Sequence, residues 1–116
     1  MRSSPVKSIK KTADFKQVYN HGKSFSNRYF VLYASPNDRG LARLGLSIGK
    51  KVGKAVVRNK IRRWIKECFR LNKFELPSVD FVIIARMSAA GLVNDAKFSE
   101  VDKSIKALLE QLRAAL

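Results

Sequence analysis

Hydrophobic residues recur every three or four positions in three parts of the chain, the spacing that gives a helix one apolar face. The first part covers residues 13–22, with Thr12 as the predicted N-cap and Gly22 as the stop. The second runs from about residue 55 to 72. The third lies near the C-terminus, and its apolar stripe consists of Phe98, Val101, Ile105, Leu108 and Leu112.

Three other segments have the pattern of β-strands. Residues 26–35 are rich in aromatic and β-branched side chains, and the turn sequence at 36–40 favours a hairpin to the next strand. In residues 41–49, apolar side chains alternate with small or polar ones, so one face would join a core. Residues 79–87 form a continuous apolar run, which is typical of a buried strand.

These six elements follow one another in the order α-β-β-α-β-α. The chain has 116 residues, enough for one domain with a core and too few for two. We therefore expect a single domain over residues 1–116 with an α+β sandwich fold, in which residues 1–8 form a flexible basic N-terminus. A further short strand is considered near Val52 or within residues 74–79.

Charge is distributed unevenly along the chain. There are 24 Lys and Arg residues against 9 Asp and Glu, a net charge of +15. Residues 1–70 carry this whole excess, while residues 71–116 are neutral. Because the cations are interleaved with apolar residues at structural spacing, they indicate a folded surface for a polyanion. We expect nucleic acid as the partner, ahead of an acidic membrane or protein.

The composition also bears on the compartment. No apolar run approaches the roughly 18 residues of a membrane span, and no hydrophobic segment follows the basic N-terminus as in a secretory signal. The single cysteine, Cys68, cannot form an internal disulfide. We therefore expect a cytoplasmic protein that does not bind membranes.

The segment from Val56 to Arg70 contains six cations and one acidic residue, Glu67. At about 100° per residue, it separates into two faces. The core face carries Val57, Ile61, Trp64, Ile65 and Cys68. The cationic face carries Asn59, Arg62, Arg63, Lys66 and Arg70, with Arg58 at its edge. Such a stripe repels itself unless a polyanion neutralises it, so a phosphate-binding face is favoured over a merely solvated one.

The loop before this helix, residues 47–54, combines two glycines with Lys50, Lys51 and Lys54. It is not a Walker A loop, because Gly, Lys and Ser/Thr do not occur in the required order. As an isolated nucleotide site the signal is weak. We expect instead a basic loop that contacts an RNA backbone.

Aromatic residues are concentrated near the N-terminus. Six of the eleven lie in the first 33 positions: Phe15, Tyr19, Phe25, Tyr29, Phe30 and Tyr33. Tyr29, Val31 and Tyr33 alternate onto one face of the predicted strand. Flat side chains beside cations suit a single-stranded nucleic acid, which needs both stacking and phosphate contacts. The alternative is that these rings only pack the first helix on the sheet, and the pattern alone does not decide between the two.

Catalytic side chains are not apparent. His21 is the one histidine and precedes a turn glycine, which suits a surface position better than a general base. Asp14, Asp38 and Asp80 are scattered over a predicted helix, turn and strand, so they offer no carboxylate pair for two metal ions. No nucleophile–base pair is evident. We expect the chain to supply neither a catalytic residue nor a metal site.

The stretch AVVRNKIRRWIK, residues 55–66, resembles the signature of the bacterial ribonuclease P protein subunit family, known as the RNR motif. The match lies in the alanine, the Arg-Asn pair and the spacing of the basic and aliphatic positions that follow. Residues 14–33, 43–56 and 79–86 also resemble segments of that family, so the similarity covers about residues 9–112.

The resemblance implies an α/β sandwich that is ribosomal protein S5 domain 2-like, with a left-handed βαβ crossover. It also implies a ribonucleoprotein endonuclease, a hydrolase that removes the 5′ leader from precursor tRNA. In that enzyme the catalytic RNA performs the hydrolysis, with Mg²⁺ bound mainly by the RNA. One protein would accompany each RNA and bind both this RNA and the precursor tRNA.

The resemblance also assigns residues. The RNA subunit would contact Lys50, Lys51, Lys54, Arg58, Asn59, Arg62, Arg63 and Lys66. The single-stranded leader would lie in a central cleft lined by Phe15, Tyr19, Val31, Tyr33 and Ser47. Tyr19 departs from the family, which often has phenylalanine there, but stacking survives that change.

Two other functions compete with this interpretation. A small ribosomal protein would bind rRNA structurally, but it has no need of an aromatic surface for a mobile single strand. An independent metal-dependent nuclease is disfavoured because clustered carboxylates are lacking.

Overall fold

The computed structural model describes residues 7–72 and 78–115. This part of the chain contains five strands, four α-helices and one short 3₁₀ helix. The strands are β1 (Lys7–Ser8), β2 (Lys23–Ser26), β3 (Phe30–Pro36), β4 (Arg43–Ser47) and β5 (Val79–Ala85). The helices are α1 (Thr12–His21), the 3₁₀ helix η1 (Lys50–Val52), α2 (Ala55–Asn72), α3 (Ala89–Asn94) and α4 (Phe98–Ala115).

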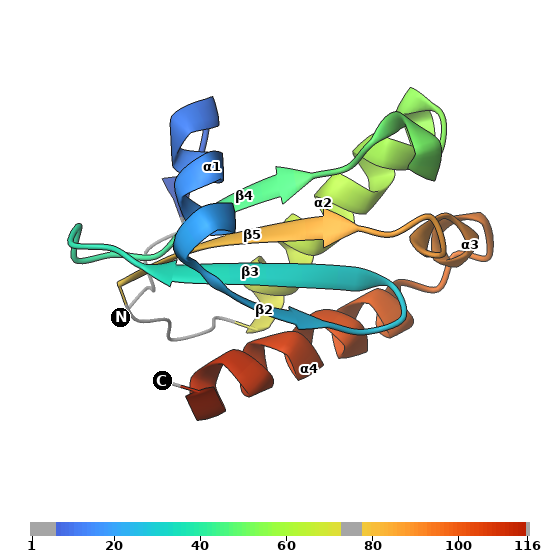
Figure 1. Cartoon of the computed structure of the whole chain (residues 1–116). Coiled ribbons are helices and arrows are strands. Elements are labelled where there is room, and N and C mark those ends of the chain that lie inside the picture. Colours follow the sequence, from blue (N-terminus) through green and yellow to red (C-terminus); the bar gives the residue numbers. More distant parts are fainter. Residues whose placement is uncertain (1–6, 73–77, 116) are drawn as a thin grey trace.

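The strands form one mixed sheet in the order β1-β4-β5-β3-β2. Its central strand, β5, is parallel to β4 and antiparallel to β3. Figure 1 shows α1 on one face of the sheet and α2 and α4 on the other. The α+β sandwich predicted from the order of elements is confirmed.

The connection from β4 through α2 to β5 joins two parallel, neighbouring strands. In Figure 1 both arrows point the same way, β4 lies above β5 and α2 passes behind the sheet, so the crossover is left-handed. About 98% of such crossovers are right-handed. The unusual handedness implied by the resemblance is therefore present.

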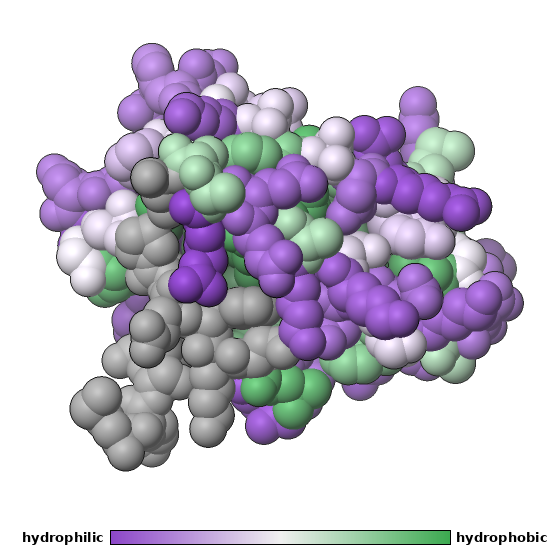
Figure 2. Space-filling model, turned by 90° about the horizontal axis from the view of Figure 1, so that it is seen from below, coloured by the Kyte–Doolittle hydropathy of each residue, from purple (hydrophilic) through white to green (hydrophobic). Residues whose placement is uncertain are grey.

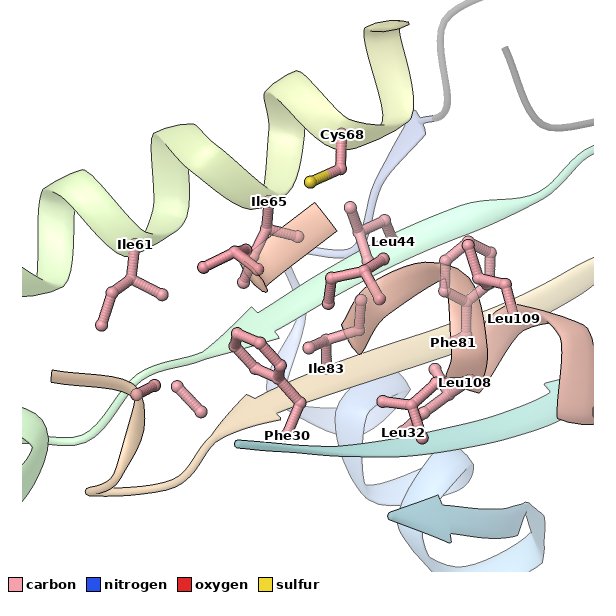
Figure 3. Packing of buried hydrophobic residues seen from close by; sticks show 14 of the residues in the cluster. Phe30, Leu32, Leu44, Ile61, Ile65, Cys68, Phe81, Ile83, Leu108 and Leu109 are labelled. Atoms are coloured by element: carbon pink, nitrogen blue, oxygen red, sulfur yellow. The ribbon is translucent and has the colours of Figure 1, made fainter. Parts of the chain in front are cut away.

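The main core lies between the sheet and the helices α2 and α4. Figure 3 shows Ile61, Ile65 and Cys68 of α2 pointing toward the sheet, where Phe30 lies. These four side chains are fully buried, and Trp64 packs against the same cluster. Each large apolar side chain buried in this way contributes about 1.5–3 kcal/mol. The predicted core face of the basic helix is confirmed.

The predicted hairpin between residues 26–35 and 41–49 is wrong, because β5 lies between β3 and β4. β5 is buried on both faces, which explains its continuous apolar sequence and suits the central position. A strand that the sequence pattern did not reveal, β2, pairs with β3 instead. In the β2–β3 turn, Oδ1 of Asn27 accepts hydrogen bonds from the backbone N–H groups of Tyr29 and Phe30, both at 3.0 Å.

The ends of α1 also differ from expectation. Thr12 is already helical and Lys11 is the N-cap, without a side-chain hydrogen bond, so the predicted cap is wrong by one residue. Gly22 does follow the last helical residue, but its φ is −88° and not left-handed. A Cβ at this position would lie 2.7 Å from the carbonyl oxygen of Ala34, so lack of space favours glycine here.

Several shorter segments were not predicted as they occur. Val52 belongs to the 3₁₀ helix rather than to a strand, and α3 was not expected. Within the N-terminus that was expected to be flexible, Lys7–Ser8 pair with β4 as β1. Residues 1–6 and 73–77 lie outside the described residues, and with them most of that N-terminus and of the strand considered at 74–79.

The face that carries α4 is largely hydrophilic. Figure 2 views the molecule from this side, and its hydrophobic patches are small and separated by hydrophilic residues. Among the helices of the described ranges, none is long and apolar enough to cross a membrane.

Candidate RNA interface

The predicted cationic face of α2 lies on the solvent side of the helix. Asn59, Arg63 and Lys66 are exposed, and Arg58 and Arg62 are half-buried. Nη1 of Arg62 donates a hydrogen bond to Oδ1 of Asn59 at 3.1 Å. Nε of Arg58 donates to a carbonyl oxygen of the preceding loop, also at 3.1 Å, which anchors its guanidinium at the start of the helix. The structure thus places these five predicted residues along one helix surface.

Little acidic charge offsets this face. Glu67, the one acidic residue of α2, accepts a hydrogen bond from Nε of Arg70 at 3.1 Å, and this contact lowers the pKa of Glu67. Within the described residues, Arg62, Arg63 and Lys66 form no ion pair. Their charge is therefore available for phosphate groups.

The lysine loop adjoins the start of α2. Lys50 and Lys51 belong to η1, and Lys54 directly precedes the helix. All three side chains are exposed. The predicted loop and the predicted helix face therefore form one continuous basic region.

On the opposite face of the sheet, α1 brings aromatic rings to β3. The ring centroids of Phe15 and Tyr19 are 6.4 Å apart, and the ring of Tyr19 meets that of Tyr33 edge-on at 5.2 Å. These three half-buried residues, which we call the aromatic face, pack against the buried Val18 and Val82. The rings therefore anchor α1 and still leave part of their surface open, so the two interpretations of the aromatic pattern are compatible.

The sheet register extends this surface beyond α1. Val31 pairs with Ile84, and Ile84 pairs with Ser47, so the three side chains form a row on the face that α1 covers in part. All three are half-buried. In the next row, Val82 and Gly45 are buried. The row from Val31 to Ser47 is thus the open continuation of the aromatic face.

An open pocket with a volume of about 680 Å³ begins at this row, because Ser47 and Ile84 belong to its lining. The lining contains no acidic residue, and its four cations are Arg28, Lys50, Lys51 and Arg86. The pocket therefore suits a phosphate group next to an apolar strip.

Hydrogen bonds hold the two loops that supply the arginines. The backbone N–H of Arg86 donates to the carbonyl oxygen of Tyr29 at 2.8 Å, and Oγ of Ser88 donates to that of Arg28 at 2.6 Å. The guanidinium of Arg28 lies 5.4 Å from the centroid of the Tyr29 ring. Tyr29 belongs to this turn and packs against the main core, so its predicted place on one strand face with Val31 is wrong.

The pocket and the predicted leader cleft overlap only in part. Ser47 lines the pocket, whereas four other predicted residues lie beside it: Phe15, Tyr19, Val31 and Tyr33. Arg28, Ile84 and Arg86 were not predicted as members of this surface. Arg86 could have been found, since it is a cation directly after a buried strand. Arg28 and Ile84 join the site only through the pairing of β3 with β5.

A polar network fixes α1 next to this surface. Arg43 binds both carboxylate oxygens of Asp80, from Nε at 2.8 Å and from Nη2 at 2.5 Å. Its Nη1 lies 3.4 Å from Oδ2 of Asp14 at the start of α1. Hydrogen bonding between Arg43 and Asp80 lowers the pKa of the carboxyl and raises that of the guanidinium. Two aspartates that are scattered in the sequence thus share one arginine.

The half-buried rings lead into a pocket whose charged residues are all cations, and a cationic helix lies beside it. This arrangement is typical of a nucleic-acid-binding protein, since such a ligand needs stacking and charge together. Comparison with known proteins is more specific. The family model described as Ribonuclease P matches residues 4–113.

Individual relatives agree over nearly the whole chain. The ribonuclease P protein component of Clostridioides difficile is 50% identical over 108 residues, which cover 91% of each chain. That of Clostridium kluyveri is 46% identical over 106 residues, or 89% of this chain and 91% of the relative. Among solved structures, the RNase P protein of Staphylococcus aureus matches with a TM-score of 0.82 at 39% identity, covering 90% of this chain and 94% of that one. The RNase P protein from Thermotoga maritima also gives 0.82, at 33% identity, covering 90% and 96%.

The chain belongs to the ribonuclease P protein family. It is a subunit of the ribonuclease P endoribonuclease, which acts with its RNA in the 5′ processing of tRNA. The alternative of a structural rRNA-binding ribosomal protein is not favoured.

Proposed function

We propose that the chain binds two RNAs at once, the catalytic RNA along α2 and the single-stranded 5′ leader of precursor tRNA along the aromatic face. The observation that carries this proposal is the continuity of the second surface. The aromatic face leads through the row Val31–Ile84–Ser47 into a pocket that is lined by four cations and no acidic residue.

In this proposal the RNA subunit binds to the basic region formed by the lysine loop and α2. Its contacts are Lys50, Lys51, Lys54, Arg58, Asn59, Arg62, Arg63 and Lys66. Support comes from the solvent side of α2, where Arg62, Arg63 and Lys66 form no ion pair within the described ranges. Arginine suits this task because its planar fork binds two phosphate oxygens at once.

The leader binds on the aromatic face. Bases stack on Phe15, Tyr19 and Tyr33, and the strand then follows Val31 and Ser47. Stacking on an aromatic ring is worth about 1–3 kcal/mol per base and tolerates different bases. Arg28 and Arg86, the two pocket cations that are not assigned to the RNA subunit, neutralise the leader phosphates that leave this strip.

Hydrolysis belongs to the RNA subunit in this division of labour, and Mg²⁺ is bound mainly by that RNA. The described residues contain no group of three or more His, Cys, Asp or Glu side chains that could hold a metal ion. Asp14 and Asp80 come close to each other only through Arg43, which occupies both carboxylates. This donor set does not suit a resident Mg²⁺. The protein contributes binding, and it screens the repulsion between two RNA backbones.

We further propose one protein per catalytic RNA and action in the cytoplasm. One α2 surface and one aromatic face on a single domain support the first proposal. The buried, single cysteine, which needs no oxidising compartment, supports the second.

Alanine substitutions at Phe15 and Tyr19 test the leader assignment. The double variant, assembled with a bacterial ribonuclease P RNA, should lose affinity for leader-bearing precursor tRNA and keep its affinity for mature tRNA. Tyr19→Phe is the matched control, because it keeps the stacking ring and should bind the leader as the parent does. Equal losses for the two tRNAs would contradict the assignment.

Reconstitution at low Mg²⁺ tests the division of labour. The protein mixed with a bacterial ribonuclease P RNA should remove the leader faster than the RNA alone. Protein that has been freed of RNA should leave the precursor intact, and cleavage by such a preparation would show that the chain itself performs the hydrolysis.

A further inference from the structure

Gly45 is a buried glycine in β4, and the ring of Phe15 lies directly against it. A Cβ at this position would lie 2.7 Å from Cε1 and 2.8 Å from Cζ of Phe15, and 3.3 Å from Cγ2 of Val82. Real Cβ atoms do not approach other atoms below 3.0 Å. Gly45 is not among the glycines with positive φ, so its backbone conformation does not require glycine. The space is taken by the far end of the Phe15 ring, which must shift if a side chain is added at Gly45.

A glycine inside a strand has a cost, because it gains no packing and loses more backbone entropy than other residues. Such a position commonly marks the close approach of another group. Here that group is the ring of Phe15, which belongs to the aromatic face. The ring occupies the space that a side chain at Gly45 would fill.

The start of α1 has a second contact with the same strand. Asp14, the neighbour of Phe15, lies 3.4 Å from Arg43, two residues before Gly45. Arg43 is itself fixed by Asp80. Consecutive residues of α1 therefore meet alternate residues of β4, which defines both the position of the helix and the depth of the ring.

We propose that Gly45 and the Asp14–Arg43 pair are positioning residues for single-strand binding, since they set the depth of the Phe15 ring and hence the shape of the aromatic face. This inference rests on the proposed leader site. Any side chain at Gly45 pushes the Phe15 ring away from β4 and toward the RNA leader that stacks on it. The ring reaches Tyr33 only through Tyr19, 6.4 Å away, so a displaced Phe15 breaks the continuity of the surface.

The test measures the affinity of the reconstituted holoenzyme for leader-bearing precursor and for mature tRNA. Gly45→Ala should weaken precursor binding by roughly 5- to 150-fold, the loss of one stacked base, and leave mature tRNA unchanged. Added to Phe15→Ala, it should cause no further loss, because the truncation removes both contacts below 3.0 Å and leaves only that with Val82 at 3.3 Å. Gly91→Ala is the control, since nothing lies within 4 Å of a Cβ there.

Three results would overturn the inference: parental leader affinity in Gly45→Ala, an equal loss for mature tRNA, or a loss that adds in full to that of Phe15→Ala. If Gly45→Ala does not fold, Asp14→Asn decides, and unchanged leader affinity in that variant overturns the proposal. The proposed leader site fails separately, when Phe15→Ala itself leaves precursor binding unchanged.

Discussion

Arg43 of β4 binds both carboxylate oxygens of Asp80 on the adjacent strand β5, and the two side chains are 12% and 9% exposed. Removing Arg43 leaves the buried Asp80 carboxylate without its cation, and only the hydrogen bond from Nδ2 of Asn37, at 2.6 Å, then compensates it. Arg43→Ala should therefore lower the free energy of unfolding by about 3–5 kcal/mol, as measured by urea denaturation. The surface pair Lys103–Glu100 is the control, since Lys103→Ala should change stability by less than about 1 kcal/mol. Similar losses for the two variants would contradict a structural role of the buried pair.

The same pair predicts how stability depends on pH. The guanidinium of Arg43 lowers the pKa of Asp80 in the folded protein, relative to about 3.9 for an unfolded aspartate. The contribution of the ionised Asp80 to the free energy of unfolding is therefore complete above its unfolded pKa. It is lost as pH falls through its folded pKa. The difference in unfolding free energy between the parent and Asp80→Asn should shrink between pH 6 and strongly acid pH. A difference that stays constant would show that Asp80 does not titrate in this way.

The cationic face of α2 predicts a salt dependence. Each phosphate contact contributes about 0.7–0.9 to the slope of log K against log salt concentration. The double variant Arg62→Ala/Lys66→Ala should reduce the slope for binding of the RNA subunit by about 1.4–1.8. The matched control Lys103→Ala/Arg113→Ala removes the same charges from α4 and should leave the slope as it is. An unchanged slope in the α2 variant would remove this face from the interface.

Cys68 should be chemically inert in the folded protein. Burial raises the pKa of its thiol to about 12, and the thiolate is the reactive form. At pH 8, iodoacetamide should label the native protein very slowly and the urea-unfolded protein rapidly, which mass spectrometry would detect. Rapid labelling without urea would mean that this part of α2 opens easily.

Some features of the fold could be predicted from the sequence because they depend on local periodicity. α2 occupies the expected residues, and its two faces separate as the 100° spacing requires. The pairing of strands could not be predicted in this way. A turn between residues 36 and 40 favours a hairpin locally, but β5 has apolar side chains on both faces and takes the central position between β3 and β4.

The candidate site likewise has one part that could be predicted from local spacing and one part that could not. The cationic face of α2 lies within one helix, so its residues could be assigned from their spacing. The surface proposed for the leader draws on α1, β3, β4, β5 and two loops, and its members Arg28 and Ile84 carry no local signal. Their approach depends on the register of the sheet, which places Ile84 between Val31 and Ser47.

The sequence by itself determined the helices α1, α2 and α4, the core face of α2, the concentration of positive charge before residue 71 and the resemblance to one family. These properties follow from residue type and spacing along the chain. Only the tertiary structure decided the order of strands, the basic pocket and the contact of Phe15 with Gly45. Each of these depends on residues that are distant in sequence, and their meeting is decided by which arrangement buries the apolar faces of all elements at once.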